Sequence, residues 1–220
     1  MLSAAVEDYL KAIYKLQRDG AVSTKEIARV LKVSAASVTN MVKRLAQLKM
    51  VVHESYKGVR LTAAGEKIAL EMVRHHRLLE TYLKEMMGYS WAEIHDEAEH
   101  LEHHISEAFE KKIDALLGYP THDPHGHPIP TADLELIETA TTPLSSAEEG
   151  QTVRVQHVSD GDPDLLQYLE ELGLVPQRTV IVMAKAPFNG PITIDVAGTE
   201  TVVGRQVASC VHVVLDDGRD

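Results

Sequence analysis

Histidine and carboxylate residues that could bind a metal ion are concentrated in the middle of the chain. Nine of the twelve histidines lie between His75 and His127. His76 and Glu80 are four residues apart, a spacing that places two side chains on one face of a helix. The run HDEAEHLEHH has potential ligands spaced by four, three and one residues, which we expect on a single side of a second helix: His95, Glu99, Glu102 and His103. Mixed imidazole and carboxylate donors suit Mn²⁺, Fe²⁺, Co²⁺ and Zn²⁺ rather than copper(I).

A solvated helix face is the alternative interpretation of these residues. Acidic faces that carry histidine are common on protein surfaces, and a single His-x-x-x-Glu pair arises by chance. His76, however, falls near the apolar stripe formed by Met72, Leu79 and Leu83, so it should point inward. A buried histidine beside carboxylates is usually a ligand or a paired group. Spacing alone leaves both interpretations open.

A second group of residues has the character of a DNA-contacting surface. A helix that enters the major groove needs small and polar side chains at its N-terminal end, so that its backbone can approach the base edges. The predicted helix that starts at Ser34 offers such side chains: Ser34, Ala35, Ala36, Ser37, Thr39, Asn40 and Lys43. An ordinary core helix with a serine cap would explain the helix alone equally well. Arg60 and Lys57 in a neighbouring hairpin favour DNA binding.

The distribution of charge agrees with a nucleic-acid partner, although the net charge of −11 taken alone does not. Residues 1–62 contain eleven Lys/Arg and five Asp/Glu, a balance of +6, and the rest of the chain has a balance of −17. A basic N-terminal third on an acidic body is typical of a protein in which one domain contacts phosphates.

The elements that position these residues follow from hydrophobic periodicity and capping residues. We expect helices over residues 7–16 and 25–31 and from Ser34 onward, and then short strands over 50–54 and 59–61 joined by a turn at Tyr56-Lys57-Gly58. This is the order of a winged helix-turn-helix. Long helices should follow over 62–87, from Ser90 through Ile105, and to about Leu117.

The C-terminal part changes to short β-branched runs. Five strands are predicted, together with one helix over 164–172, and this pattern favours a small barrel. The strands are expected at residues 153–158, 179–183, 192–196, 201–203 and 211–215. Residues 139–150 have the small, polar composition of a linker.

Bulk properties exclude several classes of protein. The chain has no apolar run of membrane-spanning length, and its start lacks the layout of a signal peptide. One cysteine, Cys210, cannot form an intramolecular disulfide. We therefore expect a cytoplasmic protein that does not interact with membranes.

Over nearly its whole length the sequence resembles the diphtheria toxin repressor family of metal-dependent transcriptional regulators, in its manganese-sensing form with a C-terminal SH3-like domain. The matching stretches are EDYLKAIYKL, VSAASVTNMVKRL, MVRHHRLLE, HDEAEHLEHH and PHGHPIP. The resemblance implies an α+β fold. Its expected parts are a winged helix-turn-helix DNA-binding domain (1–72), a helical metal-binding and dimerisation domain (73–138), a linker (139–150) and an SH3-like β-barrel (151–220).

The resemblance also implies two metal sites. The regulatory site would comprise Asp8, Glu99, Glu102 and His103. The ancillary site would comprise His76, Glu80 and His95, completed from the C-terminal domain by His157 and Asp160. The alternative interpretation of these last two residues is a surface histidine and a turn aspartate in a loop of the barrel. Members that sense iron have methionine and cysteine where this chain has Asp8 and Glu99. The oxygen donors here favour Mn²⁺ as the bound ion, with Fe²⁺ as the alternative. Zn²⁺ or Co²⁺ could occupy the sites in vitro.

Some residues depart from the family pattern or receive no role from it. The short manganese regulators have glutamate where this chain has Lys11, which puts their two-ion cluster in doubt. The resemblance implies a turn at PHGHPIP, so we interpret His122, His125 and His127 as structural or solvated. His100 and His104 have no assigned role.

The resulting hypothesis is a homodimer that binds a palindromic operator when metal is bound and represses metal uptake genes. Enzymatic activity on a small organic substrate is not expected. The rival hypotheses are an iron-responsive regulator of the same family, a metallohydrolase that carries a winged helix, and a regulator of small organic ligands. The sequence contains no HExxH motif of the kind that a metallohydrolase would use. Retained DNA affinity after chelation would favour the last rival.

Overall fold

A computed structural model describes residues 2–17, 20–54 and 57–216. The chain divides into two compact units. The first comprises residues 1–76, 101–107 and 130–135, and the second comprises residues 77–100, 108–129 and 136–220. Each unit is described by itself below.

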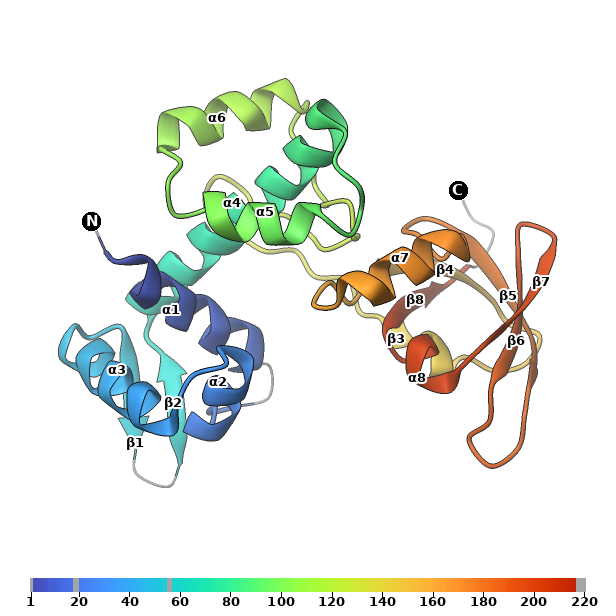
Figure 1. The fold of residues 1–220 in the computed structure, drawn as a ribbon, viewed down its shortest axis with the longest axis horizontal. Helices are drawn as coiled ribbons and strands as arrows, with labels where there is room; N and C mark the ends of the chain where they lie inside the picture. Colours follow the sequence, from blue (N-terminus) through green and yellow to red (C-terminus); the bar gives the residue numbers. More distant parts are fainter. Residues whose placement is uncertain (1, 18–19, 55–56, 217–220) are drawn as a thin grey trace. The chain divides into compact units, whose positions relative to one another are not determined.

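The first unit has the element order of a winged helix-turn-helix (Figure 1). Its elements are α1 (Ala4–Leu16), α2 (Thr24–Val30), α3 (Ala35–Gln47), β1 (Val51–Glu54), β2 (Gly58–Leu61) and the first part of α4 (Ala63–Met87). α1 packs against α2, α3 and β2. The predicted order of helices and hairpin is confirmed, and Tyr56, in the predicted turn of the hairpin, lies outside the described residues.

Capping residues and buried apolar side chains explain these elements. Ser23 and Glu26 form a capping box at the start of α2, and the Ser37 backbone N–H donates to Ser34 Oγ at the start of α3 (3.1 Å). One apolar side of each helix is fully buried, and the core includes Leu10, Ile27 and Leu45. The hairpin needs glycine at position 58, because its φ is +102° and a Cβ there would lie 2.7 Å from the Val22 carbonyl oxygen.

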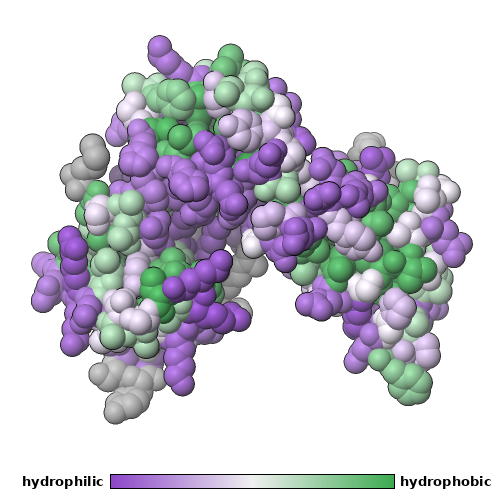
Figure 2. Space-filling view, viewed as in Figure 1, coloured by the Kyte–Doolittle hydropathy of each residue, from purple (hydrophilic) through white to green (hydrophobic). Residues whose placement is uncertain are grey.

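The helical part of the chain continues with the end of α4, α5 (Ile94–Leu101) and α6 (Glu107–Leu116). We predicted that the helix after Ser90 would run through Ile105, and this prediction is wrong: α5 ends at Leu101, and the next three residues form a turn. Figure 2 shows apolar surface over α6, where Phe109 and Leu116 are exposed. No helix in the described part of the chain is both long and apolar enough to cross a membrane.

The second unit also contains an antiparallel sheet of six strands in the order β3-β8-β4-β5-β6-β7. The strands are β3 (Thr142–Pro143), β4 (Thr152–Val158), β5 (Thr179–Lys185), β6 (Ile192–Val196), β7 (Thr199–Val203) and β8 (Val211–Leu215). Alternate residues along β6 are buried, as the period of a strand requires, and β4 follows the same alternation up to its bulge between Val155 and His157. The remaining elements are a 3-10 turn (Leu144–Ser146), α7 (Pro163–Glu171) and α8 (Arg205–Ala208).

All five predicted strands are present, and β3 is an additional strand. It lies inside the stretch that we expected to be a linker. The residue after it, Leu144, is fully buried, so the sheet begins earlier in the chain than composition suggested.

Candidate metal centre and nucleic-acid interface

Three of the four residues expected in the regulatory site lie together in the first unit. Asp8 comes from α1, and Glu102 and His103 come from the turn after α5. One ligand atom from each of the three lies within 4.8 Å of the other two. His103 Nε2 is 2.8 Å from Asp8 Oδ1 and 3.6 Å from Glu102 Oε1. Two carboxylates and an imidazole placed in this way are a suitable donor set for a divalent cation.

His103 is held from both sides of its ring. Its Nδ1 is 2.8 Å from Glu7 Oε2, on the opposite side from Asp8. A carboxylate on the nitrogen that does not face the metal is the usual arrangement for a metal-binding histidine, because it fixes the ring and makes the other nitrogen a better donor. Glu7 was not predicted as part of the site, and its adjacency to Asp8 was the only signal for it in the sequence.

Lys11 forms a buried ion pair with Glu102. Its Nζ donates to both carboxylate oxygens, at 2.8 and 2.7 Å, and Lys11 is only 5% exposed. His76 Nδ1 lies 2.7 Å from Glu102 Oε2 and 3.4 Å from Lys11 Nζ. Any cation that binds Glu102 must therefore compete with the ammonium group of this chain.

Glu99 belongs to the second unit. It lies on α5, where its Oε1 is 4.0 Å from His95 Nε2. Glu102 and His103 follow the end of α5, so the prediction that they share one side of a helix with Glu99 and His95 is wrong. The structure thus brings Asp8, Glu102 and His103 together in one unit and places Glu99 in the other.

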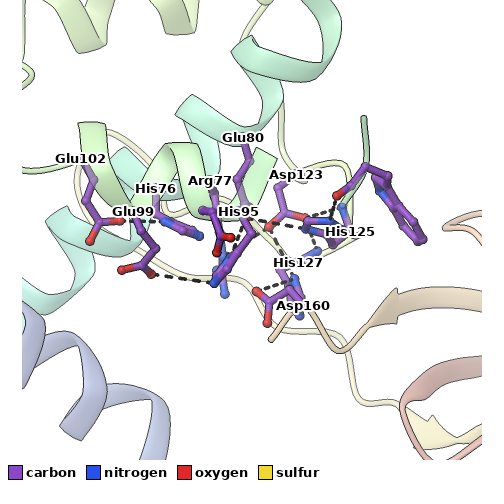
Figure 3. A network of polar contacts seen from close by, with 12 residues as sticks. His76, Arg77, Glu80, His95, Glu99, Glu102, Asp123, His125, His127 and Asp160 are labelled. Carbon is purple, nitrogen blue, oxygen red and sulfur yellow. Dashed lines mark hydrogen bonds and ion pairs between the residues drawn. The ribbon is translucent and has the colours of Figure 1, made fainter. Parts of the chain in front are cut away.

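Of the expected ancillary residues, Glu80 and His95 are in contact within the second unit (Figure 3). His95 Nδ1 is 3.1 Å from Glu80 Oε1, and Glu80 is fully buried. His76, in the first unit, precedes Glu80 by one turn of the same helix, α4, and is also buried. The inward direction predicted for His76 is confirmed.

The two residues expected from the C-terminal domain lie in the loop after β4 and at its end. Asp160 Oδ2 is 3.9 Å from His127 Nδ1. The His157 ring lies between two other imidazoles, with ring centroids 4.4 Å from His212 and 4.9 Å from His127. Their role as metal ligands stays a prediction.

Sequence reasoning gave no ligand role to Asp123 and His125, which lie against Glu80. His125 Nδ1 is 3.7 Å from Glu80 Oε1, and both residues are fully buried. Burial lowers the pKa of His125, but the nearby Glu80 carboxylate outweighs it and, with the charges of Asp123 and Asp160, raises the pKa to about 9. His122, in the same loop, is exposed, so the sequence could not separate the buried histidine from its neighbours.

The residues predicted to contact DNA are exposed together on α3 and β2. Every one of them is solvent-exposed, whereas Val38 and Val42 on the other side of α3 are buried: Ser34, Ala35, Ala36, Ser37, Thr39, Asn40, Lys43 and Arg60. The Ser34 and Ser37 hydroxyls lie 2.9 Å apart, and the Thr39 hydroxyl donates to the Ala35 carbonyl. The N-terminal end of α3 thus presents small side chains with polar groups outward.

Three family models match successive parts of the chain. The N-terminal DNA-binding domain of iron-dependent repressors matches residues 1–59, and their metal-binding and dimerisation domain matches residues 62–131. The FeoA domain matches residues 142–215. The first match covers α1 to the start of β2, the second covers α4, α5 and α6, and the third covers the six-stranded sheet.

Relatives of known type match over most of the chain. The iron-dependent repressor IdeR of Mycobacterium tuberculosis is 30% identical over 225 residues, which cover 94% of this chain and 95% of the relative. The transcriptional regulator MntR of Shouchella clausii is 38% identical over 120 residues, 54% of this chain and 83% of that protein.

A solved structure described as a manganese-dependent transcriptional repressor in complex with manganese is 39% identical, with a TM-score of 0.89. It covers 96% of this chain and 99% of its own. A structure of the manganese regulator SloR is 36% identical, with a TM-score of 0.79. The match covers 96% of this chain and 98% of the SloR chain. The chain therefore belongs to the diphtheria toxin repressor family of iron- and manganese-dependent transcriptional repressors, which bind DNA and dimerise through the helical domain.

Proposed function

We propose that this chain is a manganese-responsive repressor whose regulatory metal site is formed by Asp8, Glu102 and His103, with Glu99 as a fourth donor. The observation that carries the proposal is the cluster in the first unit, where α1 of the DNA-binding domain meets the turn after α5. Its donors are oxygen and nitrogen atoms only, and one ligand atom each from Asp8, Glu102 and His103 lies within 4.8 Å of the other two.

The choice of manganese rests on the donor types and on the relatives. Carboxylate oxygens suit Mn²⁺ better than the thiolates that softer ions prefer. The 39% identical structure was obtained with manganese. Fe²⁺ is the alternative, because a relative that matches almost the whole chain is an iron-dependent repressor.

The residues of the cluster connect metal binding to the DNA-contacting helix. Asp8 is part of α1, and α1 packs against both α2 and α3. A divalent cation bound there would offset the negative charges of Asp8 and Glu102. Glu7 and Lys11, both on α1, already contact His103 and Glu102 of the turn, and a cation bound to Asp8 would add a further link between α1 and the turn. The position of α1 on this turn sets the position of α3 in the same unit. Metal would favour repression to the extent that it binds the DNA-competent arrangement more tightly.

The exposed end of α3 would enter the major groove, with Arg60 of β2 near the phosphates. A dimer would present two such helices to a palindromic operator. The regulated genes would be those for metal uptake, and a protein that acts on the chromosome would work in the cytoplasm. The proposed domains are residues 1–72, 73–138 and 151–220, joined by the segment 139–150, of which β3 contributes to the sheet.

An ancillary site would be formed by His76, Glu80 and His95, completed by Asp160 or His157. The contact between Glu80 and His95 and the one-turn spacing of His76 and Glu80 support it. Changing His76 or Glu80 to alanine would lower the number of bound metal ions and weaken, without abolishing, metal-dependent DNA binding.

The proposal is tested by measuring operator affinity against buffered free Mn²⁺, Fe²⁺, Zn²⁺ and Co²⁺. For each metal, the free concentration that activates operator binding is compared with the cellular level of that metal. We expect this ratio to be lowest for Mn²⁺. Activation by Fe²⁺ but not by Mn²⁺ would mean that the chain is an iron-responsive repressor. Full affinity in the presence of a chelator would remove metal control altogether.

A further inference from the structure

We infer that His76 is a positioning residue of the regulatory metal site, where it orients Glu102, in addition to the ligand role proposed for it in the ancillary site. The inference rests on the proposed function, because it concerns how a regulatory ligand is held. Both residues belong to the first unit and are buried, with 2% and 1% of their surface exposed. His76 Nδ1 lies 2.7 Å from Glu102 Oε2, and Figure 3 shows the two side chains in this contact.

The two carboxylate oxygens of Glu102 face different neighbours. Oε1 lies 3.6 Å from His103 Nε2, and the same nitrogen lies 2.8 Å from Asp8 Oδ1. Oε1 is therefore the oxygen on the side of the proposed regulatory ligands. Oε2 is the oxygen that His76 contacts. One oxygen of the carboxylate can thus bind a cation while the other stays on the imidazole.

The hydrogen in the contact between His76 and Glu102 belongs to His76. An ionised carboxylate can only accept a hydrogen bond, so His76 Nδ1 is the donor. Lys11 Nζ is 3.4 Å from this nitrogen, but its hydrogen bonds to the two oxygens of Glu102 are shorter, at 2.8 and 2.7 Å. In the neutral imidazole the lone pair is then on Nε2, which is the nitrogen that would bind an ion of the ancillary site.

His76 and Lys11 differ in what they can do when the regulatory site is filled. The Lys11 ammonium group would be repelled by a dication on Oε1, because the two charges have the same sign. A neutral imidazole has no net charge and can stay on Oε2. A buried carboxylate oxygen that lost its donors would be left unsatisfied, which is costly. His76 is thus the donor that keeps Glu102 oriented in the metal-bound protein.

The turn that carries Glu102 is attached to α4 through its backbone as well. His75 Nδ1 lies 3.3 Å from the Glu102 carbonyl oxygen, and His75 directly precedes His76 on α4. α4 therefore holds both the backbone and the side chain of this ligand. Hydrogen bonds to a ligating group from residues around the metal contribute about 10- to 100-fold to metal affinity.

Variants of His76 and Glu80 separate the two roles of His76. His76→Asn keeps an amide N–H close to the position of Nδ1 but has no equivalent of Nε2, whereas His76→Ala removes both. Glu80→Ala removes a proposed ancillary ligand and leaves His76 unchanged. All three variants should therefore lose the ancillary ion, and only His76→Ala should also lose the donor to Glu102.

The affinity of the remaining site for Mn²⁺ is measured by equilibrium dialysis of the full chain, which also gives the number of bound ions. We expect His76→Ala to bind Mn²⁺ about 10- to 100-fold more weakly than Glu80→Ala. His76→Asn should recover most of this loss. Equal affinities of His76→Ala and Glu80→Ala would overturn the inference, and so would a His76→Asn variant as weak as His76→Ala.

Asp8→Asn in the same assay separates a failure of the inference from a failure of the proposed function. If Asp8→Asn binds Mn²⁺ as tightly as the wild-type chain, the regulatory site itself is wrongly assigned. If Asp8→Asn is weakened but His76→Ala matches Glu80→Ala, the regulatory site stands and the positioning role of His76 fails.

Nitrogen NMR of the wild-type protein decides the question if the His76 variants fail to fold. Proton–nitrogen correlation spectra of the histidine rings show which ring nitrogen carries a hydrogen. They are recorded for the metal-free chain and for the chain with Zn²⁺, a diamagnetic ion. We expect a hydrogen on His76 Nδ1 in both states. A His76 ring without a hydrogen on Nδ1 would overturn the inference.

Discussion

The Lys11–Glu102 ion pair is the residue-scale feature with the clearest consequence for metal sensing. A buried carboxylate needs a cationic partner, and in this chain the ammonium group supplies it. The same carboxylate is a proposed metal ligand. The chain thus carries an internal competitor for its own regulatory site, which would stabilise the metal-free protein and raise the metal concentration needed for activation.

Replacing Lys11 by methionine tests this balance. The change leaves Glu102 buried with His76 as its remaining close partner, so we expect the metal-free protein to lose about 3 kcal/mol of unfolding free energy. Mn²⁺ should bind the variant more tightly and restore much of the stability. Denaturant unfolding and Mn²⁺ titration measure the two effects. Lys15→Met, on the exposed side of the same helix, is the control. A variant with unchanged stability and unchanged Mn²⁺ affinity would show that Lys11 does not compete.

Glu99 is the residue expected to set metal choice. Glu99→Cys replaces a hard carboxylate by a thiolate at the same helix position, so the order of activation should shift toward Zn²⁺, Co²⁺ and Fe²⁺. A tenfold change in relative affinity corresponds to about 1.4 kcal/mol, a modest effect for one exchanged ligand. Glu99→Ala should weaken activation by every metal. Operator binding against free Mn²⁺ and free Zn²⁺ gives the order for each protein. If Glu99→Cys keeps the wild-type order, Glu99 does not bind the regulatory metal.

The candidate site was only partly predictable from its residues. Helical spacing was sufficient to pair His76 with Glu80, because both lie within one regular helix. Asp123 and His125 lie in an irregular loop, where spacing carries no directional information. Their proximity to Glu80 depends on how the loop folds back onto α4, and no local pattern encodes that.

At the scale of elements, the early end of α5 shows tertiary contacts overriding local preference. The residues after Leu101 contain no glycine or proline that would stop a helix. Glu102 is instead held by Lys11, and His103 by Glu7, both on α1. These buried polar contacts fix a turn that periodicity alone predicts as helix.

Elements with strong local signals were predicted more accurately. α2 and α3 begin directly after their serine caps, and the strands of the sheet match the β-branched runs. β3 was missed because it is two residues long and contains a proline. Among the residues that the structure describes, β3 pairs with β8 alone, which comes from the far end of the chain, so the sequence around β3 gave no strand pattern.

The wing and α3 carry a prediction about phosphate contacts. Changing Lys43 or Arg60 to alanine should weaken binding to all DNA sequences and lower the slope of log affinity against log salt by about one, because each side chain would release about one counter-ion. Binding of specific and random duplexes from low to moderate salt measures the slope. Lys112→Ala, exposed on α6, should not change it. An unchanged slope in both DNA-face variants would mean that another surface binds DNA.

At the scale of the whole molecule, the helical domain has apolar surface that dimerisation would cover. Phe109 and Leu116 on α6 are 41% and 59% exposed, although both are large apolar side chains. The family dimerises through this domain. We expect α6 to contribute to the interface, because exposed apolar side chains of this size are typical of interface cores.

Leu116→Asp should weaken the dimer at least about tenfold, since it places a charge in an apolar contact. Sedimentation of the variant over a range of concentrations would give the dissociation constant. Phe188→Asp is the matched control, because Phe188 is fully exposed in the hairpin between β5 and β6 of the sheet domain. If Leu116→Asp leaves the dimer unaffected and Phe188→Asp weakens it, the dimer interface lies on the sheet domain and not on α6.

The central claim is that a metal ion held by Asp8, Glu102 and His103 controls DNA binding, and one measurement tests it most directly. Operator affinity is measured against buffered free Mn²⁺ for the wild-type chain, for Asp8→Asn and for Asp96→Asn, a change in an exposed carboxylate on α5. The account predicts that Mn²⁺ strengthens operator binding by the wild type and by Asp96→Asn, and that Asp8→Asn needs at least about tenfold more Mn²⁺, because it has lost a charged ligand worth about 1.4 kcal/mol or more. An Asp8→Asn protein that responds to Mn²⁺ like the wild type would contradict it.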